Sequence, residues 1–473
     1  MRNPRLQRAL LLGFLVLAGL AVAAWALEHY GHLSINTGVV HWLWRLSVIS
    51  FLGYAVMRRS LTAWIILGML IGAEIGYNLK YLDDPTRLRY AADLQVLSSI
   101  FLKLIKTIVA PLIFGTLVVG IAGHSNLKQV GRMGIKALIY FELITTLALF
   151  IGFAAINISK AGVGVQPLAS AGTLPPAQPE KATDIILKIF PENIAKSVAE
   201  GQVLQVVVFS IIFAIALALI SEEKRRPMLA FCESLSEVMF KFTNIVMWFA
   251  PIGVLGAMAY TIGTMGLEVL KNLLSLLATL YVALAVFLFG VLLPVALLAR
   301  LPIRRFIKAV AEPVSIAFAT ASSESALPRA MESMEAFGVP RQIVAFVLPT
   351  GYSFNLDGST LYLSLASIFV AQAANIPLSF GQQVIIVLTL MLTSKGVAGV
   401  PRAMLVILLG TVASFQLPAW PVLIILGIDQ LMDMARTATN VLGNCLATAV
   451  IARWEGELGK ETPSPTALDA VAQ

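Results

Sequence analysis

The chain has 473 residues, of which 58% are hydrophobic and 13% charged, and its mean hydropathy is +0.85. This composition excludes a soluble globular protein and indicates a polytopic membrane protein, whose architecture the bilayer sets. The net charge of +8 fits basic clusters in cytoplasmic loops better than nucleic-acid binding, since neither a nucleic-acid-binding motif nor a long basic tail is present. Two cysteines, and four histidines without an H-E-x-x-H pattern, predict no disulfide framework, zinc cluster or metalloenzyme site.

Apolar runs of membrane-spanning length follow one another along the first 300 residues. They extend to Leu27 and then cover 42–57, 61–79, 97–121, 134–158, 198–220, 228–262 and 270–298. The first run resembles a signal peptide, but it is long and further spans follow at once, so we expect a retained helix. The span 228–262 exceeds a bilayer thickness and is expected to be tilted or to continue outside the membrane. The Gly/Pro/Ala-rich stretch 160–181 is predicted to be a loop.

Basic residues flank alternate spans and predict the orientation of the chain. If each span crosses once, the basic clusters lie on one side, and the positive-inside rule places both termini in the cytoplasm. The residues of these clusters are Arg2, Arg5, Arg8, Arg58, Arg59, Lys128, Arg132, Lys136, Lys224, Arg225, Arg226, Arg300, Arg304, Arg305 and Lys308. The polar tail after Trp454 is predicted to be disordered.

Two segments, 309–333 and 382–413, are interrupted by tips of small residues. The tips read T-A-S-S-E-S-A-L-P-R-A-M from Thr320 and T-S-K-G-V-A-G-V-P-R-A-M from Thr393, so both end in P-R-A-M. An odd number of crossings separates them, which predicts an inverted repeat of re-entrant hairpins with a substrate site at the midplane. Proline suits the first turn of each second arm, and the N–H groups at the tip are placed to receive an anion. The alternative is a chance match.

The apolar segment from Ile343 to Ala373 breaks at its centre, where it reads P-T-G-Y-S-F-N-L-D-G-S-T. Asn355 and Asp357 place polar groups at membrane depth, where a carboxylate costs about 2.5–3.5 kcal/mol. Irregular backbone at that depth survives where protein buries it or where it lines a wet cavity. We therefore expect an unwound binding segment, the alternative being a kinked structural helix.

The last span, from Leu417 to Ala452, carries a polar stripe. At about 100° per residue its polar positions fall within roughly 80° of one another; they are Asp429, Asp433, Arg436, Asn440 and Asn444. A guanidinium suits bidentate carboxylate recognition, and an acid one turn away is placed to hold an ammonium. The stripe therefore predicts a site for a zwitterion with a second carboxylate, the alternative being a structural ion pair between Asp433 and Arg436.

These motifs resemble the dicarboxylate/amino acid:cation symporter family, which contains the bacterial and animal glutamate transporters. The motifs are S-S-E-S-A-L-P, N-L-D-G-S, G-V-A-G-V-P and D-M-A-R-T-A-T-N, and the resemblance covers about residues 61–455, most closely the bacterial proton/glutamate–aspartate symporters. It implies an all-α polytopic membrane protein with eight core transmembrane helices, two re-entrant hairpins and, in this chain, two extra N-terminal helices. It also implies a homotrimer that moves its substrate by an elevator-like mechanism.

The resemblance further implies a division of the chain into parts. Extra helices (1–60) precede scaffold helices (61–133) and a transport-domain helix (134–158). A loop and further scaffold helices (159–262) lead to the main transport domain (263–455), and a cytoplasmic tail follows (456–473).

Site residues follow from the matched motifs. Arg436 would bind the side-chain carboxylate of the substrate and Asp433 its ammonium, while Asn440 and Thr437 line the site. The α-carboxylate would be received by Ser322, Ser323 and the backbone at Val397, Ala398 and Gly399. Dicarboxylate carriers of the family usually lack the acid that matches Asp433, which favours an acidic amino acid over succinate. The second hairpin would be the external gate.

The expected coupling ion depends on departures from the family pattern. Sodium-coupled members usually have an acid where Asn444 stands and a tyrosine where Glu142 stands, whereas Thr145 and Thr146 keep hydroxyls expected near a second sodium site. Burial raises the pKa of a carboxyl, as a proton carrier requires. We therefore predict proton coupling with Glu142, Glu324 and Asp357 as candidate carriers. For Glu142 the alternative is a neutral, hydrogen-bonded carboxyl.

The sequence thus predicts a bacterial inner-membrane symporter that imports glutamate or aspartate with protons, and no cofactor beyond the coupling ion. Sodium coupling is the alternative for the ion, because Asn355 and Asp357 still match cation-site positions. A C4-dicarboxylate symporter is the alternative for the substrate. A membrane enzyme is disfavoured, since no nucleophile–base pair, metal cluster or phosphate loop is evident, and two hairpin gates disfavour a channel.

Overall fold

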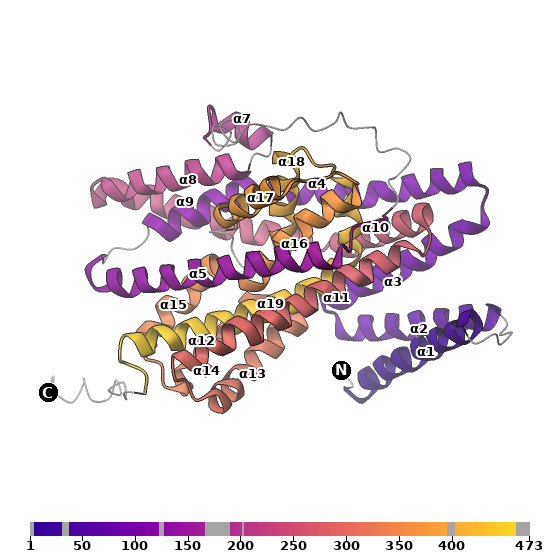
Figure 1. Ribbon diagram of the computed structural model, residues 1–473, viewed down its shortest axis with the longest axis horizontal. Coiled ribbons are helices and arrows are strands. Elements are labelled where there is room, and N and C mark those ends of the chain that lie inside the picture. The colour runs from indigo at the N-terminus through magenta and orange to yellow at the C-terminus, as the bar shows by residue number, and fades with distance from the viewer. Residues whose placement is uncertain are drawn as a thin grey trace. The chain divides into compact units, whose positions relative to one another are not determined.

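The computed structural model describes residues 4–30, 37–122, 127–165, 190–200, 203–394 and 403–459. Every regular element within these ranges is a helix, as the predicted all-α class requires (Figure 1). The chain divides into two compact units. The first comprises Met1–Leu102 and Val246–Leu267, and the second comprises Lys103–Ile245 and Glu268–Gln473.

The first unit is built around α3. Its elements are α1 (Pro4–Tyr30), α2 (Thr37–Arg58), α3 (Leu61–Asn78), a 3-10 turn (Leu79–Tyr81), the first half of α4 (Asp84–Ala122) and α10 (Ala250–Met265). Gly68, Gly72 and Gly76 lie on one face of α3 against the carbonyls of α10, and a Cβ at Gly76 would come within 2.7 Å of the Ala259 oxygen. Small residues at this spacing let the two helix backbones approach closely.

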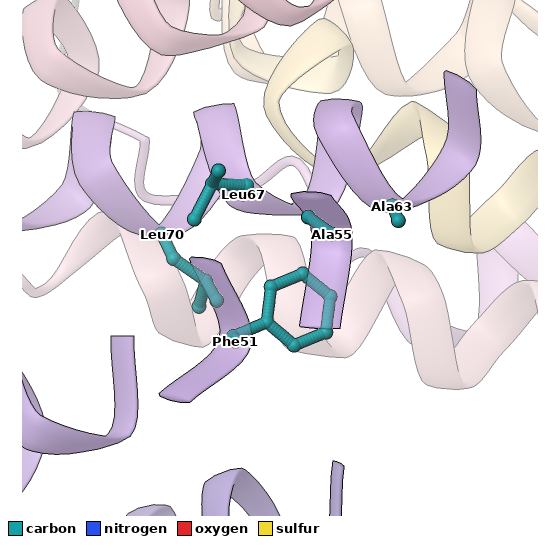
Figure 2. Packing of buried hydrophobic residues seen from close by; sticks show 5 residues of the cluster. All are labelled: Phe51, Ala55, Ala63, Leu67 and Leu70. Carbon is teal, nitrogen blue, oxygen red and sulfur yellow. The ribbon is translucent and has the colours of Figure 1, made fainter. Parts of the chain in front are cut away.

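The opposite contact of α3 is with the N-terminal helices. An apolar cluster of Phe51, Ala55, Ala63, Leu67 and Leu70 joins α2 to α3 (Figure 2). Farther along the same pair, the Nε of Arg45 lies 2.8 Å from a carboxylate oxygen of Glu74, and its Nη2 donates to Asn78 at 3.2 Å. The two predicted extra helices are therefore docked on α3 by apolar packing and by an ion pair.

The second unit contains the remaining helices. They are α5 (Leu127–Ser159), α7 (Ile194–Ala199), α8 (Val203–Leu219), α9 (Glu222–Met247), α11 (Val269–Phe287), α12 (Leu293–Leu298), α13 (Ile303–Thr320), α14 (Ser323–Phe337), α15 (Arg341–Phe354), α16 (Asp357–Ala373), α17 (Phe380–Thr393), α18 (Ala403–Ser414) and α19 (Trp420–Trp454). At its centre α16 packs against both α5 and α19 (Figure 1). Almost every residue of α16 is buried, which is why its sequence reads apolar on all sides.

The predicted interruptions are confirmed at two places. Helix α15 ends at Phe354 and α16 begins at Asp357, with Asn355 and Leu356 outside helical geometry at ψ 63° and 64°. Helices α13 and α14 form a hairpin that turns at Ala321, which has φ 50° and ψ 38°. The tip between α17 and α18 falls on residues 395–402, outside the described ranges.

The structure also departs from the predicted spans. The span 228–262 is two helices, because the chain breaks between Met247 and Ala250, and Pro251 stands at the start of α10, where proline is tolerated. The predicted span is therefore divided between α9 and α10, and its tilt or its extension outside the membrane stays a prediction. The span 270–298 contains a π-helical turn at Leu288–Leu292 just before Pro294, which has no N–H to donate.

By length and hydropathy, six helices within the described ranges qualify as membrane spans: Pro4–Ala24, Gly38–Arg58, Leu61–Tyr81, Asp84–Val119, Met133–Ser159 and Val269–Leu298. Helices α9 and α10 together would provide one more. Helix α19 is outside this set, since Asp429, Asp433 and Arg436 interrupt its apolar sequence. The chain is thus a multi-pass membrane protein, whereas re-entrant insertion of the hairpins stays a prediction. Of the predicted tail 456–473, residues 456–459 lie within the described ranges.

Candidate functional site

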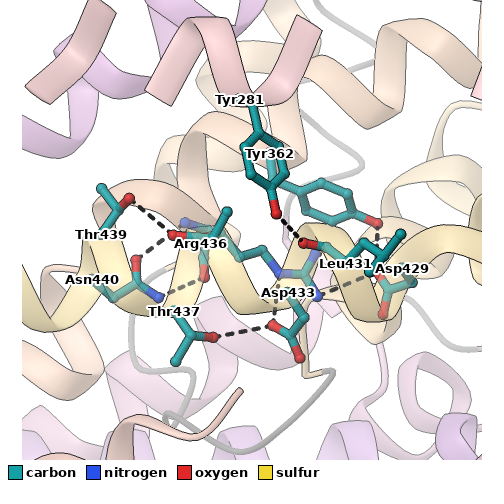
Figure 3. A network of polar contacts seen from close by, with 11 residues as sticks. Tyr281, Tyr362, Asp429, Leu431, Asp433, Arg436, Thr437, Thr439 and Asn440 are labelled. Atoms are coloured by element: carbon teal, nitrogen blue, oxygen red, sulfur yellow. Dashed lines mark hydrogen bonds and ion pairs between the residues drawn. The ribbon is translucent and has the colours of Figure 1, made fainter. Parts of the chain in front are cut away.

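A buried guanidinium held between two carboxylates lies at the middle of α19. The Nε of Arg436 is 2.8 Å from Oδ1 of Asp433, and its Nη2 is 3.3 Å from Oδ1 of Asp429 (Figure 3). Arg436 and Asp429 are fully buried, and Asp433 nearly so. The spacing of 429, 433 and 436 on one helix face produces this triad. Removing one partner of a buried ion pair typically costs about 3–5 kcal/mol, so the charges depend on one another.

Tyr362 on α16 packs against this triad. Its hydroxyl donates to Oδ1 of Asp429 at 3.3 Å, and its ring centroid lies 4.1 Å from the guanidinium carbon of Arg436 (Figure 3). A cation over an aromatic face is stabilised by about 2 kcal/mol or more when desolvated. Tyr362 therefore covers a face of the guanidinium and also bonds Asp429, one of its two ion-pair partners.

Two polar atoms of the Asp433–Arg436 pair are available to a ligand. No described residue hydrogen-bonds Nη1 of Arg436 or Oδ2 of Asp433, although both atoms are buried. Thr437 donates to Oδ1 of Asp433 at 3.2 Å, so only the other oxygen of that carboxylate is uncommitted. One donor and one acceptor thus remain on adjacent side chains, as a zwitterionic ligand with an extra carboxylate needs.

One turn farther along α19, Asn440 is committed to α16. Its Nδ2 donates to Oγ of Ser359 at 2.9 Å, and its Oδ1 accepts from the Ser359 backbone N–H at 3.2 Å. This two-bond contact holds the start of α16 against α19. Gly358 next to it must be glycine, because a Cβ there would overlap the backbone of Arg436. The break after α15 is therefore fixed against the same helix that carries the triad.

A second polar cluster lies between the break and α19. The Nδ2 of Asn355 donates to Oδ2 of Asp357 at 3.1 Å and to Oδ1 of Asn444 at 3.3 Å. Asn355 and Asp357 are fully buried, and Asn444 is 1% exposed. Glycines make room for the cluster, since a Cβ at Gly443 would lie 3.1 Å from Cγ of Asp357 and one at Gly351 would lie 2.9 Å from Cγ of Asn444. The cluster brings a single carboxylate together with two amides.

The residues of both clusters lie within a region that matches known proteins. Residues 61–454 match the sodium:dicarboxylate symporter family. The chain belongs to this family. It is 42% identical to a proton/sodium-glutamate symport protein of Bacillus caldotenax over 414 residues, which cover 86% of this chain and 97% of that protein. It is also 42% identical to a proton/glutamate-aspartate symporter of Escherichia coli (strain K12) over 416 residues, covering 86% and 95%. A C4-dicarboxylate transport protein of Bradyrhizobium sp. (strain ORS 278) is 41% identical over 418 residues, covering 86% and 92%.

Membership of the sodium:dicarboxylate symporter family makes this chain a transporter and not an enzyme. Of the residues that the sequence predicted for the site of this symporter, Asp433, Arg436 and Thr437 are in direct contact, and Asn355, Asp357 and Asn444 form the second cluster. Asn440 joins the two through Ser359. The spacing on α19 and the N-L-D-G motif were the signals that identified them.

Two predicted proton carriers of this symporter are not buried. The side chain of Glu142 is exposed on α5, on the face that also exposes Ile139 and Leu143, while Tyr140 and Phe141 point into the unit. Glu324 is exposed in the first turn of α14. Both residues therefore lie on the outer faces of their helices in the single chain, and their roles as proton carriers stay predictions. Among the three candidates only Asp357 is buried.

The residues predicted to receive the α-carboxylate lie in the two hairpin tips, and the structure describes those of the first tip. Oγ of Ser322 accepts from the N–H of Ser325 at 3.3 Å and caps α14, and Ser323 is buried behind it. Val397, Ala398 and Gly399 lie outside the described residues. Tyr362 and Ser359 escaped the sequence prediction because their roles depend on contacts between α16 and α19 that spacing within one helix does not reveal.

Proposed function

We propose that this chain is a secondary active symporter that imports acidic amino acids with protons. The observation that carries the proposal is the Asp433–Arg436 pair, which is buried, salt-bridged on one edge and uncommitted at Nη1 of Arg436 and Oδ2 of Asp433. Nη1 is placed to donate to the side-chain carboxylate of glutamate or aspartate, and Oδ2 to accept from its ammonium. Charge-assisted hydrogen bonds of this kind are the strong ones in recognition.

The charge of the triad favours an amino acid over a dicarboxylate. Asp429 and Asp433 against Arg436 leave one net negative charge in a buried site. An amino acid supplies an ammonium that neutralises Asp433, whereas a C4 dicarboxylate would bring its second carboxylate toward a like charge, which is unfavourable. The relatives include a protein named a C4-dicarboxylate transport protein, so a dicarboxylate remains the second candidate.

Proton coupling is favoured by the composition of the second cluster. Asn355, Asp357 and Asn444 provide one carboxylate where sodium would need a shell of hard oxygen ligands. Burial in a medium of low polarity disfavours the charged form of a carboxylate, and binding a proton removes that charge. We assign the proton to Asp357. Relatives named proton/sodium-glutamate symport proteins keep sodium coupling as the alternative.

The remaining features of the proposal concern architecture. We propose a homotrimer in the bacterial inner membrane with both termini in the cytoplasm, and an elevator-like movement of the part that carries the site. In support, every described site residue lies in the second unit, while the helices α1, α2, α3 and α10 of the first unit carry none of them. The second hairpin, α17 and α18, is proposed as the external gate.

The test of the substrate and ion is uptake of labelled L-glutamate into proteoliposomes. An inward proton gradient and an inward sodium gradient are applied separately at equal external pH, with aspartate and succinate as competitors. Protons alone are expected to drive uptake, and aspartate to compete better than succinate. Uptake that requires sodium would refute the coupling assignment, and uptake of succinate without glutamate would refute the substrate.

The test of the site is Arg436→Ala. We expect uptake of L-glutamate to fall to background while the purified variant keeps its oligomeric elution volume, because the carboxylate loses its donor. Arg87→Ala is the matched control, since Arg87 pairs with Asp84 at 2.9 Å in the first unit and should leave the KM unchanged. Wild-type glutamate uptake in Arg436→Ala would remove Arg436 from the site.

A further inference from the structure

Four buried polar atoms lie on α5, on α15 and the break that follows it, and on α19, helices that pack against one another. They are the hydroxyls of Tyr140 on α5 and Tyr352 on α15, Oδ1 of Asn355 and Nδ2 of Asn444, and no described residue hydrogen-bonds any of them. Tyr140 is 3% exposed and Tyr352 is 5% exposed. These two hydroxyls have no part in the proposed substrate site, so their burial calls for another explanation.

The two tyrosines lie on the side of the second cluster that leads to the ends of α5 and α19. Tyr140 is one turn from Lys136 on the same face of α5, and Lys136 pairs with Glu455 at 2.6 Å just after the end of α19. The ring of Tyr140 lies 6.1 Å from that of Trp454. In the other direction, the neighbouring Phe141 reaches Gly351, where an added Cβ would lie 3.4 Å from its Cζ, and Gly351 also faces Asn444 of the second cluster. Tyr140 therefore lies on α5 between the level of the second cluster and the Lys136–Glu455 pair.

Tyr352 and the C-terminal part of α19 carry further polar groups between the second cluster and the Lys136–Glu455 pair. Tyr352 follows Gly351, which faces Asn444 and whose carbonyl accepts from the N–H of Asn355 at 2.7 Å. At about 100° per residue, positions 444, 448 and 455 of α19 fall within roughly 40° of one another. Thr448 is fully buried on this line and bonds back to its own helix at the Asn444 carbonyl. Polar groups thus mark a line from Asn444 to Glu455.

Buried polar groups without partners are rare, because each loses its hydration and gains nothing in return. Four of them within one packed region are most simply satisfied by buried water, which typically makes about three hydrogen bonds to such groups. Two hydroxyls that both donate and accept, an amide donor and an amide oxygen are a suitable set of partners. An apolar cavity would stay dry, but this region is polar.

We propose that Tyr140 and Tyr352 hold buried water between Asp357 and the Lys136–Glu455 pair, and that the coupling proton leaves Asp357 along this water. The inference deepens the proposed proton coupling and rests on it. The proton passes from the Asp357 carboxyl to a water, each tyrosine hydroxyl accepts one proton as it gives up another, and the proton is released at Glu455 or to bulk water. The tyrosines are unchanged at the end, and Asp357 is left as a carboxylate.

The titratable groups that face this route are few among the described residues. Asp357 is on α16, Tyr352 on α15 and Cys445 on α19, with Lys136 and Glu455 at the far end. Glu142 lies on the other face of α5 and is exposed. A change in proton movement caused by Tyr140→Phe therefore reports on the route itself and not on a neighbouring carboxyl.

The experiment compares net uptake with exchange in proteoliposomes that hold the full chain. Net uptake of labelled L-glutamate under a proton gradient requires that Asp357 release its proton, whereas exchange against internal glutamate at equal pH does not. Tyr140→Phe and Tyr352→Phe are each expected to slow net uptake by about tenfold or more, the scale of a lost proton-transfer group, and to keep exchange within about twofold. Tyr260→Phe is the matched control, since Tyr260 is also 5% exposed but lies on α10 in the first unit.

The outcomes separate this inference from the proposed function. Absence of proton-driven uptake in the wild type overturns the proposed function and the proton route with it. Proton-driven uptake in the wild type that is unchanged in both tyrosine variants overturns the route alone. Equal losses of net uptake and exchange in either variant would show a structural role and would also overturn it.

The melting temperature of the variants tests the buried water without transport. If the hydroxyls were unsatisfied, replacing tyrosine by phenylalanine would remove a desolvated polar group, and the melting temperature would rise. With bound water the hydroxyls are satisfied, so the melting temperature of Tyr140→Phe and Tyr352→Phe is expected to stay the same or fall. A rise in both variants would refute the hydration.

Discussion

Arg436 illustrates how one residue can be both structural and functional. Its Nε and Nη2 neutralise Asp433 and Asp429, and its face rests on Tyr362, which together make burial of a guanidinium tolerable. The remaining nitrogen is then presented in a fixed direction, because the rest of the planar group is clamped. A lysine at this position would lack the second nitrogen that pairs with Asp429 and the planar face that rests on Tyr362. The Asp433–Arg436 ion pair was the alternative to a binding role for Arg436. In the structure the same ion pair orients Arg436 for binding.

At the second cluster, we predict that Gly443→Ala impairs coupled transport. Alanine normally favours a helix over glycine by about 1 kcal/mol, but here its Cβ would lie 3.1 Å from Cγ of Asp357 and overlap the carboxylate. Overpacking of this kind typically costs about 1–3 kcal/mol. Uptake of L-glutamate should fall at least about tenfold, and the melting temperature should drop. Gly19→Ala is the control, because no atom lies within 4 Å of its added Cβ.

The predicted polar residues that the structure brings into contact share a property. Asp429, Asp433 and Arg436 interact within one helix, so their spacing alone reports the contact. Tyr362 and Tyr140 act across helices, and nothing in their local sequence distinguishes them from ordinary core tyrosines. The face of α5 on which Glu142 lies was unpredictable for a related reason, since membership of an apolar span does not say which face of the helix is buried.

At the scale of elements, breaks were predictable where polar and helix-weakening residues coincide. Pro349, Gly351, Asn355 and Asp357 occur together, and the chain does leave the helix between Phe354 and Asp357. The break before α10 was missed because both sides of it are apolar, and Pro251 is compatible with the first turn of a new helix as well as with a kink. Helix boundaries in a continuous apolar run depend on packing, which periodicity does not contain.

The contact of α3 with α10 yields a prediction at this scale. Gly72→Ala should destabilise the first unit by about 1–3 kcal/mol, because its Cβ would lie 3.0 Å from the carbonyl carbon of Leu255 and force the two backbones apart. The melting temperature of the purified protein measures the effect. Gly19→Ala again serves as the control and should be neutral or stabilising. A stability equal to the wild type in Gly72→Ala would mean that α3 and α10 are not closely packed in the membrane.

At the scale of the whole molecule, the site and the N-terminal addition belong to different units. The family match begins at residue 61, so α1 and α2 lie outside it. They are nonetheless joined to α3 by the cluster around Phe51 and by Arg45, which shares Glu74 with Asn78. Apolar faces gain little from packing in lipid, because lipid is equally apolar. The polar contacts should therefore provide most of the specificity of this docking.

This reasoning predicts that Arg45→Ala lowers the melting temperature while leaving the KM for L-glutamate unchanged, because every described site residue lies in the other unit. The loss should be about 1 kcal/mol, since the Arg45 side chain is 44% exposed and that of Glu74 is 20% exposed. Much of that loss comes from an acid left without its cation. The double variant Arg45→Ala/Glu74→Gln should accordingly recover part of the stability that Arg45→Ala loses, and a double-mutant cycle measures the coupling. Additive losses would mean that the pair does not hold α2 to α3, and a raised KM in Arg45→Ala would mean that the N-terminal helices act on the substrate site.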